Sequence, residues 1–223
     1  MTTFTKEFAL FLHSEDNIQF GEFTLASGRT SPYYIDLRQL LAHSAQYKKM
    51  VDALAAAIAS NPAIQDNCSL VSVPTGGLVV AASLAYATGS PLAYVRKEAK
   101  AYGTGKRVEG GAGVGSELVM IEDVVSTGGS IIDALGPLRE EGLAVRNAYA
   151  VIDRMRGTTA KLAEEGVALH SLVTIVDIVR CLFEEGRISG ATVTKVLTDA
   201  HGDRSDIDGQ EGQEERGERE RSS

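Results

Sequence analysis

Apolar residues along the chain follow two patterns, which predict different elements. Near the N-terminus they recur at helical spacing, around residues 8–11 and again at 50–58, and we expect a helix at each place. From about residue 69 onward, short apolar runs without polar alternation are separated by helix-length stretches. Such runs are typical of strands buried on both faces of a parallel sheet. The runs are residues 70–73, 92–95, 118–121, 145–152 and 172–176.

This alternation predicts an α/β fold with a mostly parallel central sheet flanked by helices on both faces. Residues 16–40 differ, because they favour short strands with turns at Ala26-Ser27-Gly28 and Ser31-Pro32. We expect them to form a small N-terminal hood over the sheet. Since ligands of parallel sheets bind beyond the carboxyl ends of the strands, the loops after the apolar runs are the candidate site.

The last residues of the chain, 201–223, have a different composition. They contain one aliphatic residue, Ile207, together with eight acidic residues and four arginines. A segment with so little apolar surface cannot offset the entropy that ordering would cost. We therefore predict a single domain at 1–200, with the hood at about 1–40 and the core at about 41–200, followed by a disordered charged tail at 201–223.

The composition narrows the class of protein. The 223 residues include 30 acidic and 22 basic side chains, and the resulting net charge of −8 argues against a general nucleic-acid binder. No run approaches the roughly 18 apolar residues of a membrane span, and the first residues lack a signal-peptide pattern, so we expect a cytoplasmic protein. Cys68 and Cys181 and the four histidines have no ligand-like spacing, and we predict no disulfide and no direct metal site.

The most informative segment joins the apolar run at 118–121 to the next helix. The run ends in Glu122 and Asp123, a Ser/Thr/Gly loop follows at 126–130, and an amphipathic helix then begins. A helix N-terminus preceded by glycines offers unpaired backbone N–H groups to a phosphate. The loop is neither a Walker A loop nor a Rossmann fingerprint. The two carboxylates suit the hydroxyls of a sugar phosphate, although such a pair alone also fits a turn or a helix cap.

Residues 118–130 as a whole resemble the phosphoribosyl-diphosphate (PRPP) motif of type I phosphoribosyltransferases. That motif is a hydrophobic run, two acids, two apolar residues and a Thr/Ser-x-Gly-x-Ser/Thr loop. The resemblance implies that Glu122 and Asp123 hold the ribose 2- and 3-hydroxyls of PRPP and that the following loop holds its 5-phosphate. The loop positions are Val124, Val125, Ser126, Thr127, Gly128, Gly129 and Ser130.

A basic segment at residues 96–107 has a local charge of +4 in an otherwise acidic chain, and a glycine-rich stretch follows it. Concentrated positive charge attracts a polyanion such as pyrophosphate, and the glycines favour a mobile lid. A solvated hairpin tip is the alternative interpretation.

Three blocks narrow the resemblance to orotate phosphoribosyltransferases. They are Arg-Lys-Glu-Ala-Lys at 96–100, the hood segment at 20–34, and Asp153-Arg154, and the resemblance covers about residues 5–200. It implies that Arg96, Lys97 and Lys100 contact the pyrophosphate of PRPP, with Lys97 reaching across the interface of a homodimer. Lys100, Glu122 and Asp123 are the expected catalytic residues.

The same resemblance implies the remaining substrate contacts. Ser126 and Arg154 are expected to bind the carboxylate and ring edge of orotate, with backbone groups around Tyr34 and Ile35 completing that pocket. Further positions expected in the PRPP site are Tyr102, Thr75 and Gly76.

Three positions depart from the bacterial members of the family. Ala26 stands where they have lysine, Thr75-Gly76 near their Tyr-Lys pair, and Tyr102 where they have histidine. The loss of two cations should weaken PRPP binding or shift that work to other groups, such as the backbone N–H groups of the loop at 73–77. Tyr102 can donate a hydrogen bond, but it cannot carry a proton near neutral pH as histidine can.

These observations together predict transfer of the 5-phosphoribosyl group from PRPP to orotate, giving orotidine 5-phosphate and pyrophosphate in pyrimidine biosynthesis. We expect Mg²⁺ as cofactor, held mainly by PRPP and water, and a homodimer with shared sites. Two alternatives remain open. One is another type I phosphoribosyltransferase acting on a purine or uracil, and the other is a non-catalytic, PRPP-sensing regulator.

Overall fold

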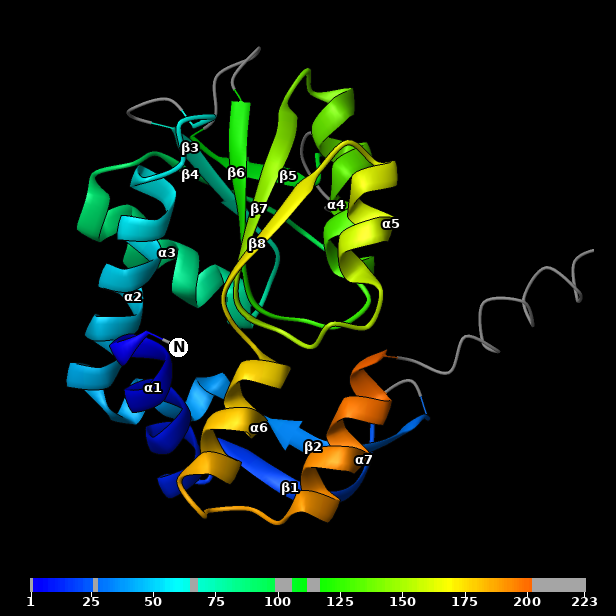
Figure 1. Ribbon diagram of the computed structural model, residues 1–223. Helices are drawn as coiled ribbons and strands as arrows, with labels where there is room; N and C mark the ends of the chain where they lie inside the picture. The colour runs from blue at the N-terminus through cyan, green and yellow to red at the C-terminus, as the bar shows by residue number, and fades with distance from the viewer. Residues whose placement is uncertain (1, 26–27, 65–67, 99–105, 112–116, 202–223) are drawn as a thin grey trace, which may run out of the picture.

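The computed structural model describes residues 2–25, 28–64, 68–98, 106–111 and 117–201, and Figure 1 shows their arrangement. The helices and strands alternate along most of the chain. In order they are α1 (Thr3–Ser14), β1 (Ile18–Thr24), β2 (Thr30–Ile35), the 3₁₀ helix η1 (Leu37–Ala42), α2 (Ser44–Ala59), β3 (Ser69–Ser72), α3 (Gly76–Thr88), β4 (Leu92–Val95), β5 (Val108–Gly110), β6 (Glu117–Val125), α4 (Gly129–Glu140), β7 (Ala144–Asp153), α5 (Thr158–Glu164), β8 (Ala168–Thr174), α6 (Ile175–Glu184) and α7 (Gly190–His201).

The central sheet has the strand order β5-β4-β3-β6-β7-β8. Five of its strands run parallel to one another: β4, β3, β6, β7 and β8. The edge strand β5 is antiparallel to its neighbour β4. α2 and α3 cover one face of the sheet, and α4 and α5 cover the other (Figure 1). The predicted fold class, a mostly parallel sheet flanked by helices, is therefore confirmed.

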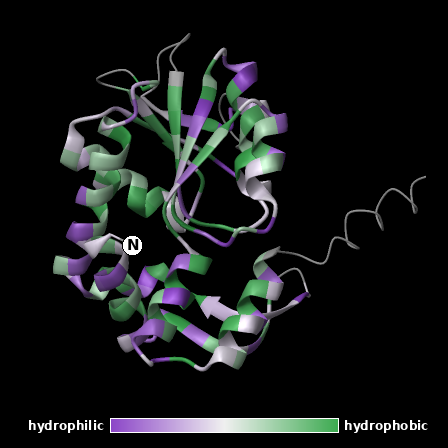
Figure 2. Cartoon of the chain, viewed as in Figure 1, coloured by the Kyte–Doolittle hydropathy of each residue, from purple (hydrophilic) through white to green (hydrophobic). Residues whose placement is uncertain are grey.

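The sheet separates two hydrophobic cores because successive side chains of a strand point to opposite faces. In β6, Val119 and Ile121 belong to the core under α2 and α3. Leu118 and Met120 belong to the core under α4 and α5. Figure 2 accordingly shows mainly hydrophobic residues in the middle of the sheet.

All five apolar runs contain a strand; the runs at 92–95, 118–121 and 145–152 lie wholly within strands, Val73 lies just after β3, and the run at 172–176 departs most from the prediction. β8 ends at Thr174, and Ile175 and Val176 already belong to α6, so the prediction of a strand over those two residues is wrong. Thr174 caps the helix, because its hydroxyl oxygen accepts a hydrogen bond from the Asp177 backbone N–H while the Asp177 carboxylate accepts from the Thr174 N–H. This capping box ends the strand inside an apolar run.

The predicted hood contains the antiparallel pair β1 and β2. Its turn lies at 25–29, where Gly28 has φ +79° and its N–H donates to the Leu25 carbonyl; Ala26 and Ser27 lie outside the described residues. The second predicted turn, at Ser31-Pro32, is wrong, because both residues lie within β2. The strand pairing shifts register between Phe20 and Phe23, and a strand at such an irregularity tolerates proline without an N–H donor.

The hood lies beyond the carboxyl ends of the parallel strands, and the C-terminal helices α6 and α7 lie beside it (Figure 1). The hood and the helices α6 and α7 therefore bring the two ends of the chain together. The division into a hood at 1–40 and a core at 41–200 stays a prediction, and the predicted tail after His201 lies outside the described residues. Among the described helices, none is long and apolar enough to span a membrane.

Candidate active site

The phosphate loop predicted at 126–130 lies between β6 and α4. Gly128 has φ +79°, and its carbonyl accepts hydrogen bonds from the N–H groups of Ile131 and Ile132. A Cβ at Gly128 would lie 3.0 Å from the methyl group of Thr158, so both the backbone conformation and the available space favour glycine. No side chain caps α4. Its first N–H groups are thus available to an anion.

A cavity of about 300 Å³ opens over this loop. Glu122 lines it together with the loop, and so the structure brings the first predicted acid and the predicted phosphate-binding positions to one place. Its lining residues are Glu122, Val124, Val125, Ser126, Thr127, Gly128, Gly129, Ser130, Ile131 and Asp133.

The two acids at the end of β6 differ in their surroundings. Glu122 is buried, with 8% of its surface exposed, and its Oε1 accepts a hydrogen bond from the Asp123 backbone N–H at 3.1 Å. Burial, followed by the side-chain hydrogen bond and the charge of Asp123, raises the pKa of Glu122 to about 9, whereas the hydrogen bond from the Asp123 backbone N–H lowers it. This environment favours the protonated form of Glu122, which can donate a hydrogen bond as well as accept one.

The predicted pyrophosphate loop at 73–77 lies against these acids because β3 and β6 are neighbours in the sheet. A Cβ added at Gly76 would lie 2.0 Å from Asp123 Oδ2, and one at Gly77 would lie 2.3 Å from Glu122 Oε1. Glycine thus lets the start of α3 approach the carboxylates. Thr75 is exposed beside them, so the structure brings Thr75 and Gly76 to the predicted PRPP site.

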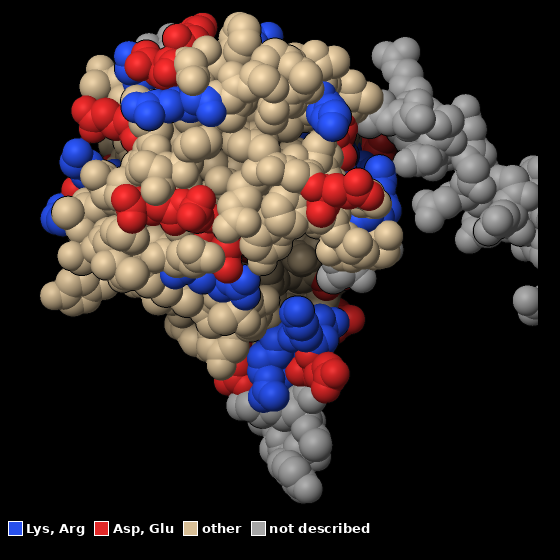
Figure 3. Space-filling view, turned by 90° about the horizontal axis from the view of Figure 1, so that it is seen from below, with Lys and Arg blue, Asp and Glu red and all other residues tan. Residues whose placement is uncertain are grey.

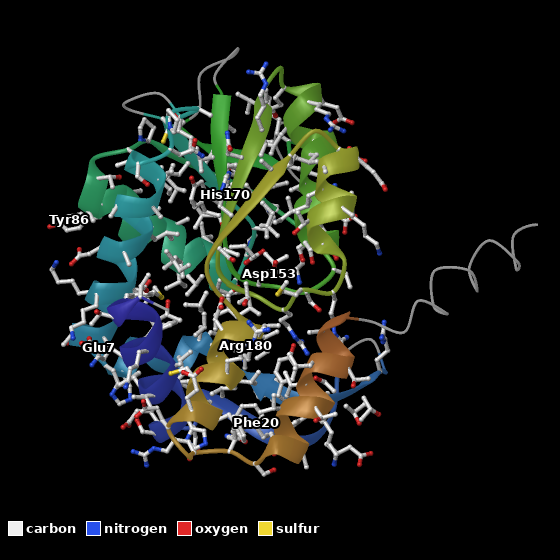
Figure 4. The ribbon with its side chains drawn as sticks, in the orientation of Figure 1. Glu7, Phe20, Tyr86, Asp153, His170 and Arg180 are labelled. Carbon is white, nitrogen blue, oxygen red and sulfur yellow. The ribbon has the colours of Figure 1, made fainter. Side chains whose placement is uncertain are left out.

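Arg154 follows β7 on the same side of the sheet, and its backbone N–H donates to the Val125 carbonyl at 2.9 Å. Its guanidinium reaches β2 of the hood, where Nε donates to Tyr33 Oη and Nη2 donates to Ser31 Oγ, both at 2.9 Å. Asp153, at the end of β7 that faces the hood in Figure 4, accepts a hydrogen bond from the Met155 N–H. Burial raises the pKa of the Asp153 carboxyl.

The side chains of Tyr34 and Ile35 lie next to this contact, and the predicted role of their backbone groups in the orotate pocket stays a prediction. The hydroxyl of Tyr34 accepts a hydrogen bond from Arg38 at 3.4 Å, and its ring packs on Phe23. Ile35 packs against the hydrophobic core. The side chains that contact Arg154 are Ser31 and Tyr33, which alternate with Tyr34 along the strand. That alternation is the signal in the sequence that could have identified them.

The basic segment begins as an antiparallel hairpin of β4 and β5. Arg107 Nε donates to the Arg96 carbonyl at 3.0 Å, and Lys106 pairs with Glu141. Lys97 is exposed. Figure 3 shows Lys and Arg side chains gathered on one protruding part of the molecule, beside a hollow.

Three of the sequence-predicted positions cannot be placed. Lys100, Tyr102 and Ala26 lie outside the described residues. Among the residues the structure does describe, no group of three His, Cys, Asp or Glu side chains could hold a metal ion.

The sequence is similar to a known protein family over much of its length. Residues 37–172 match the family model of the phosphoribosyl transferase domain. An orotate phosphoribosyltransferase from Cenarchaeum symbiosum is 42% identical over 193 residues, which are 86% of this chain and 96% of that protein.

Solved structures are similar as well. An orotate phosphoribosyltransferase from Aeropyrum pernix is 36% identical with a TM-score of 0.68, over 81% of this chain and 99% of that one. A UMP synthase from Leishmania donovani is 28% identical with a TM-score of 0.77, over 88% of this chain and 42% of that one.

Proposed function

The chain belongs to the phosphoribosyltransferase family and, within it, to the orotate phosphoribosyltransferases, and we propose that it transfers the 5-phosphoribosyl group from PRPP to orotate. One observation carries this function. A helix N-terminus without a side-chain cap, an acid pair and a guanidinium held by the hood meet at the carboxyl end of the sheet. These groups match the phosphate, the ribose hydroxyls and the carboxylate of the two substrates.

The acid pair Glu122 and Asp123 and the loop at 126–130 are proposed to orient the ribose. Displacement at the anomeric carbon builds positive charge on the ribose ring while pyrophosphate leaves with negative charge. We assign the ribose hydroxyls to Asp123 and to protonated Glu122, and the 5-phosphate to the loop at 126–130. Rigid placement of both ends of the ribose leaves its anomeric carbon facing the base, which lowers the entropic part of the barrier.

The basic segment at residues 96–107 is proposed to bind the leaving pyrophosphate. We assign it to Arg96, Lys97 and Lys100, with Lys100 opposite the developing charge. Backbone N–H groups of the loop at 73–77 supply part of the attraction that the missing family cations would give. When this segment closes, it excludes the water that would otherwise hydrolyse PRPP.

Mg²⁺ fits a site of this kind without a dedicated cage. Its oxygen ligands would come mainly from PRPP and water, as Mg²⁺ prefers, with the partly exposed carboxylate of Asp123 beside it. When bound, the ion neutralises charge on the leaving group. Orotate that binds as an anion needs no general base at its attacking nitrogen.

We further propose a homodimer, and α3 supports this. Apolar residues surround most of this helix, including positions where it faces solvent, and Tyr86 is 92% exposed. Figure 4 shows Tyr86 pointing away from the molecule. A helix that is apolar all round is usually covered, and a second copy of the chain is the occupant that also lets Lys97 reach a neighbouring site. A cytoplasmic location is part of the same proposal, because the charged substrates do not cross membranes unaided.

The decisive test of the function is an assay of the purified protein with PRPP and Mg²⁺. Orotate consumption is followed by absorbance, and the product is identified by mass spectrometry; parallel reactions contain uracil, adenine or hypoxanthine. The proposal expects orotidine 5-phosphate from orotate and no turnover when Mg²⁺ is chelated. Turnover of another base alone would favour a salvage enzyme, and PRPP binding without any turnover would favour a regulator.

Shared sites have their own test. Lys97→Ala and Asp123→Asn should each have strongly reduced activity, and their mixture should regain activity because a hybrid dimer contains one site with both defects and one with neither. Native mass spectrometry of tagged chains must confirm subunit exchange. Exchange without regained activity, or a monomer at the assay concentration, would contradict the shared-site proposal.

A further inference from the structure

Side chains from both ends of the chain surround Arg154, and they lie outside the family match at 37–172. Ser31 and Tyr33 come from β2 of the hood, and Asp199 comes from α7. We call these three residues the arginine anchor. Nothing in the reaction chemistry requires them to touch substrate, yet two of them bind the guanidinium directly.

The hood part of the anchor is rigid. Tyr33 and Ser31 are both fully buried. Ser31 Oγ accepts from Arg154 and donates to the Tyr33 carbonyl at 2.8 Å, so both of its hydrogen-bonding roles are fixed. The Tyr33 ring also lies 4.5 Å from the guanidinium carbon. Burial raises the pKa of Tyr33, which keeps its hydroxyl protonated at neutral pH.

The hydrogen bonds from Arg154 to Tyr33 and Ser31 occupy one edge of the guanidinium and leave its other donors for a ligand. Arginine has five N–H donors, and the two bonds to the hood use the Nε–H and one N–H of Nη2. Within the described residues, the nearest carboxylate is Asp199, whose Oδ2 lies 4.0 Å from Arg154 Nη2, beyond hydrogen-bond distance. The outer end of the guanidinium therefore has the donors that a planar carboxylate accepts in pairs.

Asp199 binds a second arginine, Arg156, which lies near Arg154. Its carboxylate accepts hydrogen bonds from Nε and Nη2 of Arg156, and both side chains are largely buried. Burial and then the positive charge of Arg154 lower the pKa of Arg156. Asp199 thus separates two neighbouring guanidiniums and keeps Arg156 bound to α7.

We propose that the arginine anchor positions Arg154 for the carboxylate of orotate, so that the hood and α7 determine the affinity for the base while leaving PRPP binding unchanged. The inference rests on the proposed function. Ser31 and Tyr33 are positioning residues because they act through Arg154, and Asp199 supports them by binding Arg156 next to that side chain.

Tyr33→Phe is the sharpest test, because it removes one hydroxyl and conserves the ring. We expect the KM for orotate to rise about tenfold, through the loss of one hydrogen bond to a charged group, with the KM for PRPP nearly unchanged and the melting temperature lowered no more than in the control. Tyr149→Phe is the matched control. It also removes a buried hydroxyl, which accepts from Asn61 at 3.0 Å, and its ring packs on His170, which Figure 4 shows away from the hood.

Two further variants test the rest of the anchor. Ser31→Ala removes the second hydrogen bond to Arg154, and the double variant Arg156→Gln/Asp199→Asn removes the contact with α7. The double variant removes both charges of the buried pair, whereas Asp199→Asn alone would leave Arg156 unpaired and lower the folded fraction. Folded Tyr33→Phe and Ser31→Ala proteins with an unchanged KM for orotate would overturn the inference. So would an equal rise in both KM values, or a similar rise in Tyr149→Phe. If the wild type does not turn over orotate, it is the proposed function that fails.

Discussion

Gly76→Ala should weaken PRPP binding without unfolding the protein. The new Cβ would lie 2.0 Å from Asp123 Oδ2 and 2.6 Å from the carboxylate carbon, distances at which one of the groups must move. The backbone at Gly76 is helical and needs no positive φ, so the start of α3 itself accepts alanine. The carboxylate of Asp123 lies at the end of a rotatable side chain and is the group that moves.

The size of the effect follows from what Asp123 holds. A hydrogen bond to a charged group contributes about 1.5–3 kcal/mol, so turning the carboxylate away from a ribose hydroxyl should weaken PRPP binding by about 10- to 100-fold. Gly77→Ala should behave differently. Its Cβ would meet buried Glu122 at 2.3 Å and Ser72 Oγ at 2.9 Å, which should lower the free energy of unfolding by about 1–3 kcal/mol.

Isothermal titration calorimetry with PRPP and Mg²⁺, together with thermal unfolding, separates the two effects. Gly190→Ala, at the start of helix α7, is the control: its added Cβ would meet only the Phe183 ring, at 3.7 Å, so PRPP affinity and stability should stay nearly unchanged. Wild-type PRPP affinity in Gly76→Ala would refute the reasoning, since Asp123 could then turn away at no cost to binding.

Three further changes have defined outcomes. Asp123→Asn should raise the KM for PRPP at least about tenfold and lower turnover with little change in melting temperature, because a charged acceptor of ribose hydroxyls is lost. Lys100→Ala should lower kcat by about 10²- to 10³-fold while changing orotate affinity far less; normal turnover would make the basic segment a solvated hairpin. The raised pKa of Glu122 gives stability that is fully present below pH 4.5 and is lost as pH rises toward about 9, so urea unfolding at pH 6 and pH 9 should show a smaller difference in Glu122→Gln than in the wild type.

The sequence was sufficient for the central sheet and for the phosphate loop because both are local. Apolar runs such as 92–95 coincide with β4 to the residue, and the order of acids, loop and helix around Gly128 is continuous in the chain. The exception at β8 also has a local cause. A capping box at Thr174 ends a strand within an apolar run, and an apolar run alone does not show where a strand gives way to a helix.

Alternation along β2 indicates that Ser31 and Tyr33 share one face, but their contact with Arg154 was not predictable, since it depends on contacts between distant residues. Tyr33 lies 121 positions from Arg154, and Asp199 belongs to a helix that the sequence assigns no chemistry. The raised pKa of Glu122 likewise follows from its burial, which only the packing of β3 beside β6 produces.

The ratio of kcat/KM for orotate to kcat/KM for uracil, measured in the wild type and in Arg154→Ala, tests the central claim most directly. Uracil lacks the carboxylate that Arg154 is proposed to bind, and a site built for a charged group rejects an analogue without it. The account predicts that the wild type prefers orotate by at least about 10²-fold and that Arg154→Ala loses most of this preference. A wild type that uses uracil equally well, or an Arg154→Ala variant with undiminished preference, would contradict it.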